Sequence, residues 1–245
     1  MELLQPSVLS LLLVTLATSV VTLFTGFGVG TVLMPVMALF FDVKVAIFLT
    51  AIVHGCNNLS RIVLYRQAID WRVIRRFGSV SVVGAFIGSY AQLYLSGDWL
   101  KSGVGLFLLL YGAFSLLPRG LNFALPKSMD ALGGFLSGLL GGLIGNQGAI
   151  RSLYLLQQGL GKEELIASAA LIAVLIDVTR IPVYAYTQFH AMEEHAALLA
   201  LVVCASVAGT LIGGRLLPKV SYDWFKRIVL VAIAALGMLL LMGRI

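Results

Sequence analysis

The chain carries the same sequence pattern in two places that lie far apart. Residues 58–65 (NLSRIVLY) are matched by residues 177–184 (DVTRIPVY) at an offset of 119 positions. Residues 84–88 (GAFIG) are matched by residues 209–213 (GTLIG) at an offset of 125 positions. A duplication of this size restricts the fold to two similar halves that pack against each other, and it places a candidate substrate site where the halves meet.

Long apolar runs indicate the surroundings in which these halves fold. Only 11% of the residues are charged and 60% are hydrophobic, with a mean hydropathy of +0.99, whereas soluble domains have roughly 25% charged residues. Several runs approach or exceed the roughly 20 residues that a helix needs to span a bilayer. The sequence therefore predicts an all-α polytopic membrane protein. Glu2 is the only early charge and residues 3–24 are apolar, which favours a retained first segment over a cleaved signal peptide.

Charged residues indicate on which side of the membrane each loop lies. Basic loops are typical of the cytoplasmic side. The loop after Tyr65 contains four arginines within residues 66–76, whereas the matching loop after Tyr184 contains Glu193 and Glu194. Equivalent loops are therefore expected on opposite sides, so the two repeats are predicted to be inverted. The same asymmetry accounts for the net charge of +6 without a nucleic-acid partner.

The predicted architecture is two inverted repeats in the cell (inner) membrane, with both termini on the non-cytoplasmic side. Each repeat is a glycine-broken pair of short helices followed by three transmembrane helices. Whether each short pair crosses the membrane or re-enters it is left open. The predicted segments are a first repeat at 1–117 (short pair 7–41, spans 43–66, 73–95 and 98–117), a cytoplasmic linker at 118–130, and a second repeat at 131–245 (short pair 131–160, spans 165–186, 196–217 and 223–242).

A glycine-rich break interrupts each short pair, at residues 26–30 (GFGVG) and 145–148 (GNQG). Irregular backbone at membrane depth is tolerated only where protein buries it or where it lines a cavity. A helix that starts after the break directs free N–H groups and its positive end towards the break. The breaks are thus predicted to bind an anion, and the alternative is that their glycines only allow close helix packing, as we expect for residues 84–88 and 209–213. The candidate substrate-binding residues here are Gly28, Gly30, Asn146, Gln147 and Gly148.

Arg151 lies in the first turn of the second short helix, directly after the break. A guanidinium beside free N–H groups is suited to an oxyanion. The alternative is a structural salt bridge to Asp177, the one acidic residue in the interior of a predicted span, and both can hold in alternate states. Arg61 and Arg180 lie closer to predicted membrane ends, so we expect that their side chains can snorkel to the interface.

Polar residues form a stripe on one face of each of two predicted spans. The stripes are Asn58, Arg61 and Tyr65 in one repeat and Asp177, Arg180 and Tyr184 in the other. Such stripes face the interior of a bundle, so Asn58 and Arg180 join the candidate substrate-binding residues. His54, one turn before Asn58, and Asp177 are candidate carriers of a coupling proton. A helix cap or an interhelical hydrogen bond explains a single polar residue better than it explains a duplicated stripe.

Several different glycine-rich and charged motifs are distributed along most of the chain. The motifs are residues 26–30 followed by Pro35, the helix start at 42–46, residues 132–141 (LGGFLSGLLG), the helices that contain Gly84 and Gly209, and residues 96–101 (SGDWLK). This set resembles the sulfite exporter TauE/SafE family of membrane permeases for sulfur-containing anions. The resemblance implies a secondary transporter of a small anion, namely sulfite, a sulfonate or another sulfur compound, that works by alternating access in a lipid bilayer. Protons or sodium are the candidate coupling ions, and a homodimer is left open.

In that family the second break is usually glycine-rich and followed by proline, and the second break of this chain departs from that pattern. Here residues 146–151 read NQGAIR and contain no proline. The change adds hydrogen-bonding groups and a positive charge, which favours an anion but leaves its identity open.

Other function classes lack their motifs in this sequence. No nucleotide-binding G-x-x-x-x-G-K-[ST] motif occurs, and neither H-E-x-x-H nor G-x-S-x-G is present. Cys56 and Cys204 have no partner at metal-ligand spacing. We therefore expect no catalytic residue, no metal and no cofactor. A passive anion channel or a subunit of a larger membrane complex is the alternative function, and a membrane-embedded enzyme is less favoured.

Overall fold

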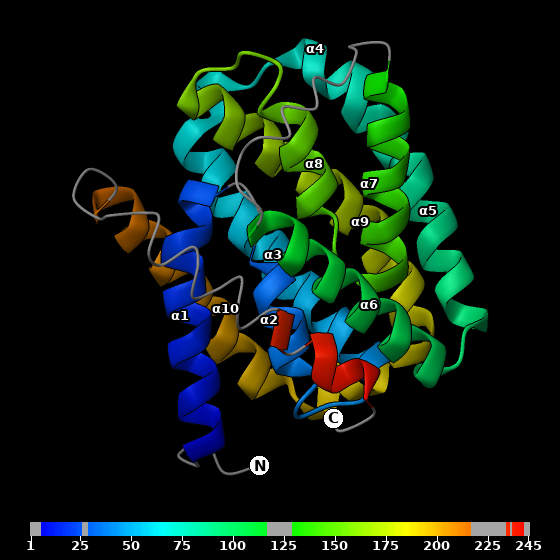
Figure 1. Ribbon diagram of the computed structural model, residues 1–245. Coiled ribbons are helices and arrows are strands. Elements are labelled where there is room, and N and C mark those ends of the chain that lie inside the picture. The colour runs from blue at the N-terminus through cyan, green and yellow to red at the C-terminus, as the bar shows by residue number, and fades with distance from the viewer. Residues whose placement is uncertain (1–5, 26–28, 117–128, 217–233, 236, 243–245) are drawn as a thin grey trace.

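The computed structural model of the protein describes residues 6–25, 29–116, 129–216, 234–235 and 237–242. Within these ranges the chain is all-helical, as the sequence predicts, and it contains ten α-helices (Figure 1). The helices are α1 (Pro6–Thr25), α2 (Gly30–Met37), α3 (Val43–Tyr65), α4 (Trp71–Val73), α5 (Ser79–Tyr94), α6 (Gly97–Leu116), α7 (Asp130–Ile144), α8 (Gly148–Leu155), α9 (Lys162–Glu194) and α10 (Ala196–Leu216). A 3-10 turn (Arg66–Ala68) follows α3, and a π-helical segment (Ile74–Gly78) joins α4 to α5.

Three helices in the described ranges are long and apolar enough to cross a membrane. They are Val43–Ala68, Lys162–Glu194 and Ala196–Arg215. The 33 residues of α9 correspond to about 50 Å of helix, so α9 is longer than the roughly 30 Å hydrocarbon core. Most of the sixth predicted span, residues 223–242, lies outside the described residues.

The outer surface of α5 is apolar. Val83, Phe86, Ile87 and Tyr90 are all about half exposed, although each is a large hydrophobic side chain. In water such a continuous exposed row would be unfavourable, whereas lipid tails accommodate it. The lipid bilayer is therefore the natural surroundings of this helix.

At the starts of three helices, carboxylate side chains accept main-chain hydrogen bonds. The carboxylate of Asp42 accepts from the Lys44 N–H at the start of α3, at 2.9 Å, and that of Asp70 accepts from the Arg72 N–H before α4, at 2.8 Å. At the start of α9, Glu164 accepts from the Gly161 N–H at 2.8 Å. Each bond satisfies a donor that helix geometry leaves without an intrahelical partner.

Two short helices, α2 and α8, follow the glycine-rich breaks. Each has eight residues, or about 12 Å of helix, so neither can cross a 30 Å core alone. At the second break, Gly145 ends α7 in the left-handed conformation, with a φ of 79°, which glycine adopts without strain. At the first break, Gly28 lies outside the described residues. Figure 1 shows α2 in the lower half of the molecule and α8 in the upper half.

Glycines allow α5 to pack closely along α7. A Cβ atom added at Gly84 would collide with the main-chain carbonyl of Phe135, and one at Gly88 would collide with that of Leu139. The prediction that these two glycines serve helix packing is confirmed.

The α1–α10 pair is built in the same way. An added Cβ at Gly209 would meet the carbonyl of Leu16, and one at Gly213 would meet that of Val20 at 2.8 Å. Gly209 and Gly213 lie 125 positions after the two glycines of α5, and Leu16 and Val20 lie 119 positions before their partners in α7. The two tight helix pairs therefore join positions that correspond in the two sequence repeats.

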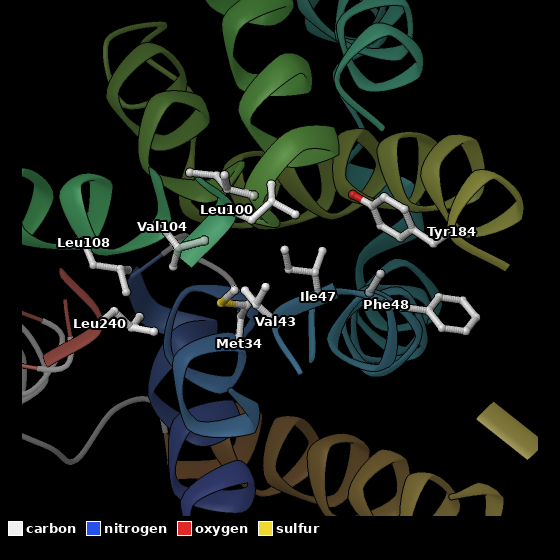
Figure 2. Close-up of a cluster of buried hydrophobic side chains, with 11 residues drawn as sticks. Met34, Val43, Ile47, Phe48, Leu100, Val104, Leu108, Tyr184 and Leu240 are labelled. Carbon is white, nitrogen blue, oxygen red and sulfur yellow. The ribbon is translucent and has the colours of Figure 1, made fainter. Parts of the chain in front are cut away.

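A hydrophobic cluster connects α2, α3, α6 and α9 with the segment at 237–242 (Figure 2). Met34, Ile47, Leu108, Tyr184 and Leu240 each contribute a side chain that is at most 2% exposed. This cluster lies next to the second break, because an added Cβ at Gly145 would be 3.6 Å from Ile47 and 3.7 Å from Met34. The packing thus holds the irregular backbone in place from one side.

Candidate functional site

Four polar side chains from three separate segments meet inside the protein, and none is more than 2% exposed. The Nδ1 atom of His54 in α3 lies 2.7 Å from Oδ2 of Asp177 in α9. The other carboxylate oxygen, Oδ1, accepts from Nε of Arg180 at 2.9 Å and from Nε2 of Gln147 at 3.2 Å. Both oxygens of Asp177 are therefore occupied, and the predicted coupling candidates His54 and Asp177 are in direct contact.

The two glycine-rich breaks converge on this network. An added Cβ at Gly30, the first residue of α2, would be 3.4 Å from the ring of His54 and 3.6 Å from the carbonyl of Gly145. Gln147, in the second break, also lies 3.4 Å from Nδ1 of His54. α3 and α9 run side by side, which presents their polar stripes to the same interior region. Residues that are far apart in the sequence are thus brought to one place by α2, α3, α8 and α9.

Arg180 and Tyr184 anchor the end of α7. The Nη1 atom of Arg180 donates to the carbonyl of Gly141 at 2.6 Å, and the Tyr184 hydroxyl donates to the carbonyl of Gly142 at 2.5 Å. The last carbonyls of a helix need such partners because no later turn supplies them. The expectation that Arg180 snorkels to the membrane surface is wrong: its side chain is fully buried, since Asp177 and these helix-end carbonyls attract it inward.

Arg151 is buried without a carboxylate partner among the described residues. It is 1% exposed, and its Nη1 atom donates to Oε1 of Gln147 at 3.3 Å. Its Nε atom has no hydrogen-bond partner within the described part of the chain. The alternative of a direct Arg151–Asp177 salt bridge is not what the structure has, because His54, Gln147 and Arg180 already occupy that carboxylate.

Asn146, the residue after the left-handed Gly145, has an unpaired amide. The side chain is 1% exposed, and neither its nitrogen nor its oxygen has a partner among the residues that the structure describes. Burying an amide without hydrogen bonds costs roughly 1–3 kcal/mol. Asn146 lies two residues before α8, whose first N–H groups lack intrahelical acceptors. The segment from Asn146 to Arg151 therefore contains several donors and a positive charge.

Asn58 is buried near this region but is engaged within its own helix. Its side-chain nitrogen donates to the carbonyl of His54 at 2.8 Å, and the residue is 1% exposed. The structure therefore places Asn58 beside the network rather than in it.

Arg61 belongs to the first polar stripe but was not among the predicted substrate-binding residues. Its side chain is 4% exposed, and its Nη2 atom donates to the hydroxyl of Thr22 in α1 at 3.0 Å. The expectation that Arg61 snorkels is also wrong, because Thr22 holds the guanidinium inside the protein. The position that Arg61 shares with Arg180 in the repeat is the sequence signal that could have identified it.

A second polar cluster, also missed from the sequence, links α1, α3 and α10. The Asn57 side-chain nitrogen donates to the Ser206 hydroxyl at 2.9 Å and to the Thr210 hydroxyl at 2.6 Å. Ser19 lies 3.0 Å from Ser206. Small hydroxyl residues in membrane helices commonly form such interhelical bonds, so this cluster stabilises packing.

The described residues contain no group of three or more His, Cys, Asp or Glu side chains that could hold a metal ion. The network around Asp177 is rich instead in hydrogen-bond donors and arginine charge. These are groups that bind an anion rather than a cation.

The fold is that of a polytopic helical membrane protein whose interior contains a network of buried polar and charged side chains. The sequence model of the sulfite exporter TauE/SafE family matches residues 11–240. The chain therefore belongs to the sulfite exporter TauE/SafE family, whose members are membrane transporters of sulfur-containing anions and not enzymes. No curated protein and no solved structure matches the chain.

Proposed function

We propose that this protein is a secondary transporter that moves a small sulfur-containing oxyanion, such as sulfite or a sulfonate, by alternating access. The proposed binding site consists of the Asn146 amide, the N–H groups at the start of α8 and the guanidinium of Arg151. Gly30 and Gln147 border it at the meeting of the two breaks. Arg151 is the observation that carries the proposal, because a buried guanidinium that forms no salt bridge within the described part of the chain is suited to a bound anion.

Energetics support an anion at this place. Removing a charged group from water costs several kcal/mol unless an opposite charge compensates it. Arg151 has one neutral acceptor among the described residues, the Gln147 side chain, and the nearby Asn146 amide has none. An oxyanion would accept hydrogen bonds from both side chains and would neutralise the arginine.

Alternating access requires two structural halves that can rock against each other, and inverted repeats supply them. Corresponding contacts support this arrangement: Arg61 donates to the carbonyl of Thr22 at 3.5 Å, and Arg180 donates to that of Gly141 at 2.6 Å. Arg180 follows Arg61 by 119 positions, and Gly141 follows Thr22 by the same offset. Figure 1 has α4 at the top and the α9–α10 junction at the bottom, consistent with opposite sides for these loops. In this proposal the basic α4 end faces the cytoplasm.

The His54–Asp177 pair is the proposed carrier of a coupling proton. An imidazole can gain or lose a proton near neutral pH, and a buried titratable residue in a membrane helix is commonly functional. Gln147 contacts both the pair and Arg151, so a change of charge at His54 is felt at the anion site. We expect a His54→Gln variant to transport the anion without responding to a pH gradient, measured in proteoliposomes. A full response by this variant would exclude the pair.

Transport in proteoliposomes tests the proposed site. The protein is expected to move radiolabelled sulfite, and Arg151→Ala is expected to abolish this flux while the purified protein remains folded by circular dichroism. Arg75→Ala is the matched control, because Arg75 is exposed in the π-helical segment between α4 and α5 and donates to the main-chain carbonyl of Trp71. Unchanged sulfite flux in Arg151→Ala would remove Arg151 from the site.

A further inference from the structure

We infer that Gln147 is a positioning residue that keeps Arg151 apart from Asp177 and so leaves the guanidinium available to an anion. This inference rests on the proposed function of Arg151. It gives Gln147 a role different from that of a direct substrate ligand, because Gln147 acts on the anion through Arg151.

The side-chain amide of Gln147 lies between the two charged groups. Its Oε1 atom accepts from Nη1 of Arg151 at 3.3 Å, and its Nε2 atom donates to Oδ1 of Asp177 at 3.2 Å. An amide offers an acceptor and a donor at once and carries no charge of its own. It therefore gives the cation and the carboxylate one hydrogen bond each and neutralises neither of them.

Neighbouring helices hold Gln147 in this place. The residue directly precedes α8 and is 1% exposed. Its main-chain carbonyl accepts from the hydroxyl of Ser137 in α7 at 2.9 Å. A Cβ atom added at Gly141 of α7 would be 2.9 Å from the Cβ of Gln147 and 3.2 Å from Ile176 of α9. The stem of Gln147 is thus enclosed by α7 and α9, which fixes the position of its amide.

Removing the amide would allow the two charges to meet. Gln147 and Arg151 are four positions apart and share one helix face, so Arg151 points along the side chain that ends at Asp177. His54 and Arg180 also bind this carboxylate, and Gln147 occupies a further position on it. In a region of low dielectric constant a carboxylate strongly attracts a cation that can reach it. Without Gln147 we expect Arg151 to pair with Asp177, which withdraws the guanidinium from the anion.

Thermal unfolding of the purified protein in detergent, without added sulfite, tests this inference through a reversal of sign. Removing a buried charge that has no counter-charge stabilises a protein, whereas breaking a buried ion pair destabilises it. Arg151→Gln is therefore expected to raise the unfolding temperature in the wild-type background. In a Gln147→Met background the same change is expected to lower it by at least about 5 °C, because it breaks the new pair with Asp177.

Matched variants separate this role from packing. Gln147→Asn keeps the amide but shortens the side chain by one methylene, which withdraws it from its partners, so it is expected to give the same reversal. Gln157→Met removes an exposed glutamine beyond α8 that donates to the carbonyl of Leu153 at 2.9 Å, and it is expected to give none. An effect of Arg151→Gln with the same sign in the wild-type and both Gln147 backgrounds would overturn the inference.

Sulfite binding, measured by isothermal titration calorimetry, gives a second readout. Gln147→Met is expected to weaken binding by at least about 10-fold, and Gln157→Met is expected to leave it unchanged. Wild-type affinity in folded Gln147→Met would overturn the inference and leave the proposed anion site intact. Failure of the wild-type protein to bind sulfite would overturn the proposed function together with this inference.

Discussion

The two polar stripes of this protein occupy corresponding positions in the repeats but differ in how their charges are compensated. Arg61 and Arg180 are both buried, and each donates to a main-chain carbonyl on a neighbouring helix. Asp177 neutralises Arg180, whereas Asn58 stands at the matching place beside Arg61. The shared contacts hold the helices together in both halves. The second stripe therefore carries its own counter-charge, whereas the first has a neutral amide at the matching position.

The largest expected effect follows from removing the acid of the second stripe. Asp177→Asn leaves Arg180 and its helix-end contacts without a compensating charge, and breaking one side of a buried ion pair costs about 3–5 kcal/mol. We expect a large loss of thermal stability in detergent, measured by the unfolding of the purified protein. A variant that unfolded at the wild-type temperature would show that Asp177 does not neutralise Arg180.

The corresponding change in the first stripe is expected to be much smaller. Asn58→Ala removes one hydrogen bond within α3, from Asn58 to the carbonyl of His54, which contributes about 0.5–1.5 kcal/mol. In the same unfolding assay the loss should be well below that of Asp177→Asn. Equal losses in the two variants would contradict the distinction between a stripe that carries its own counter-charge and one that does not.

Local sequence patterns were sufficient for much of the fold. Glycines spaced four apart predicted close helix packing, and the structure shows it in the α5–α7 and α1–α10 pairs, since only a residue without a side chain permits that approach. The short segment after the second break predicted a helix that cannot cross the membrane alone, and α8 has only eight residues. Gln147 was selected because it lies in the second glycine-rich break, and His54, Asp177 and Arg180 were selected from the polar stripes of two predicted spans. The structure brings these four side chains together.

The residues that each buried arginine contacts could not be predicted from its position in the sequence. Arg61 and Arg180 lie near the ends of their predicted spans, yet both are buried, because Thr22 and Gly141 on neighbouring helices offer oxygen atoms that the linear sequence does not reveal. Arg151 was considered as a partner of Asp177, but contacts across helices depend on how each helix is rotated. The roles of the predicted site residues stay predictions, and Gly28 also lies outside the described residues.

The central claim is that an oxyanion is the missing partner of Arg151, and direct binding tests it most simply. Calorimetric titration of the purified protein with sulfite at pH 8 should give saturable binding in the wild-type protein. Arg151→Gln, which keeps hydrogen-bonding capacity but removes the charge, should weaken that binding by at least about 10-fold, while Arg75→Gln should leave it unchanged. Sulfite binding of wild-type affinity in a folded Arg151→Gln variant would contradict the account.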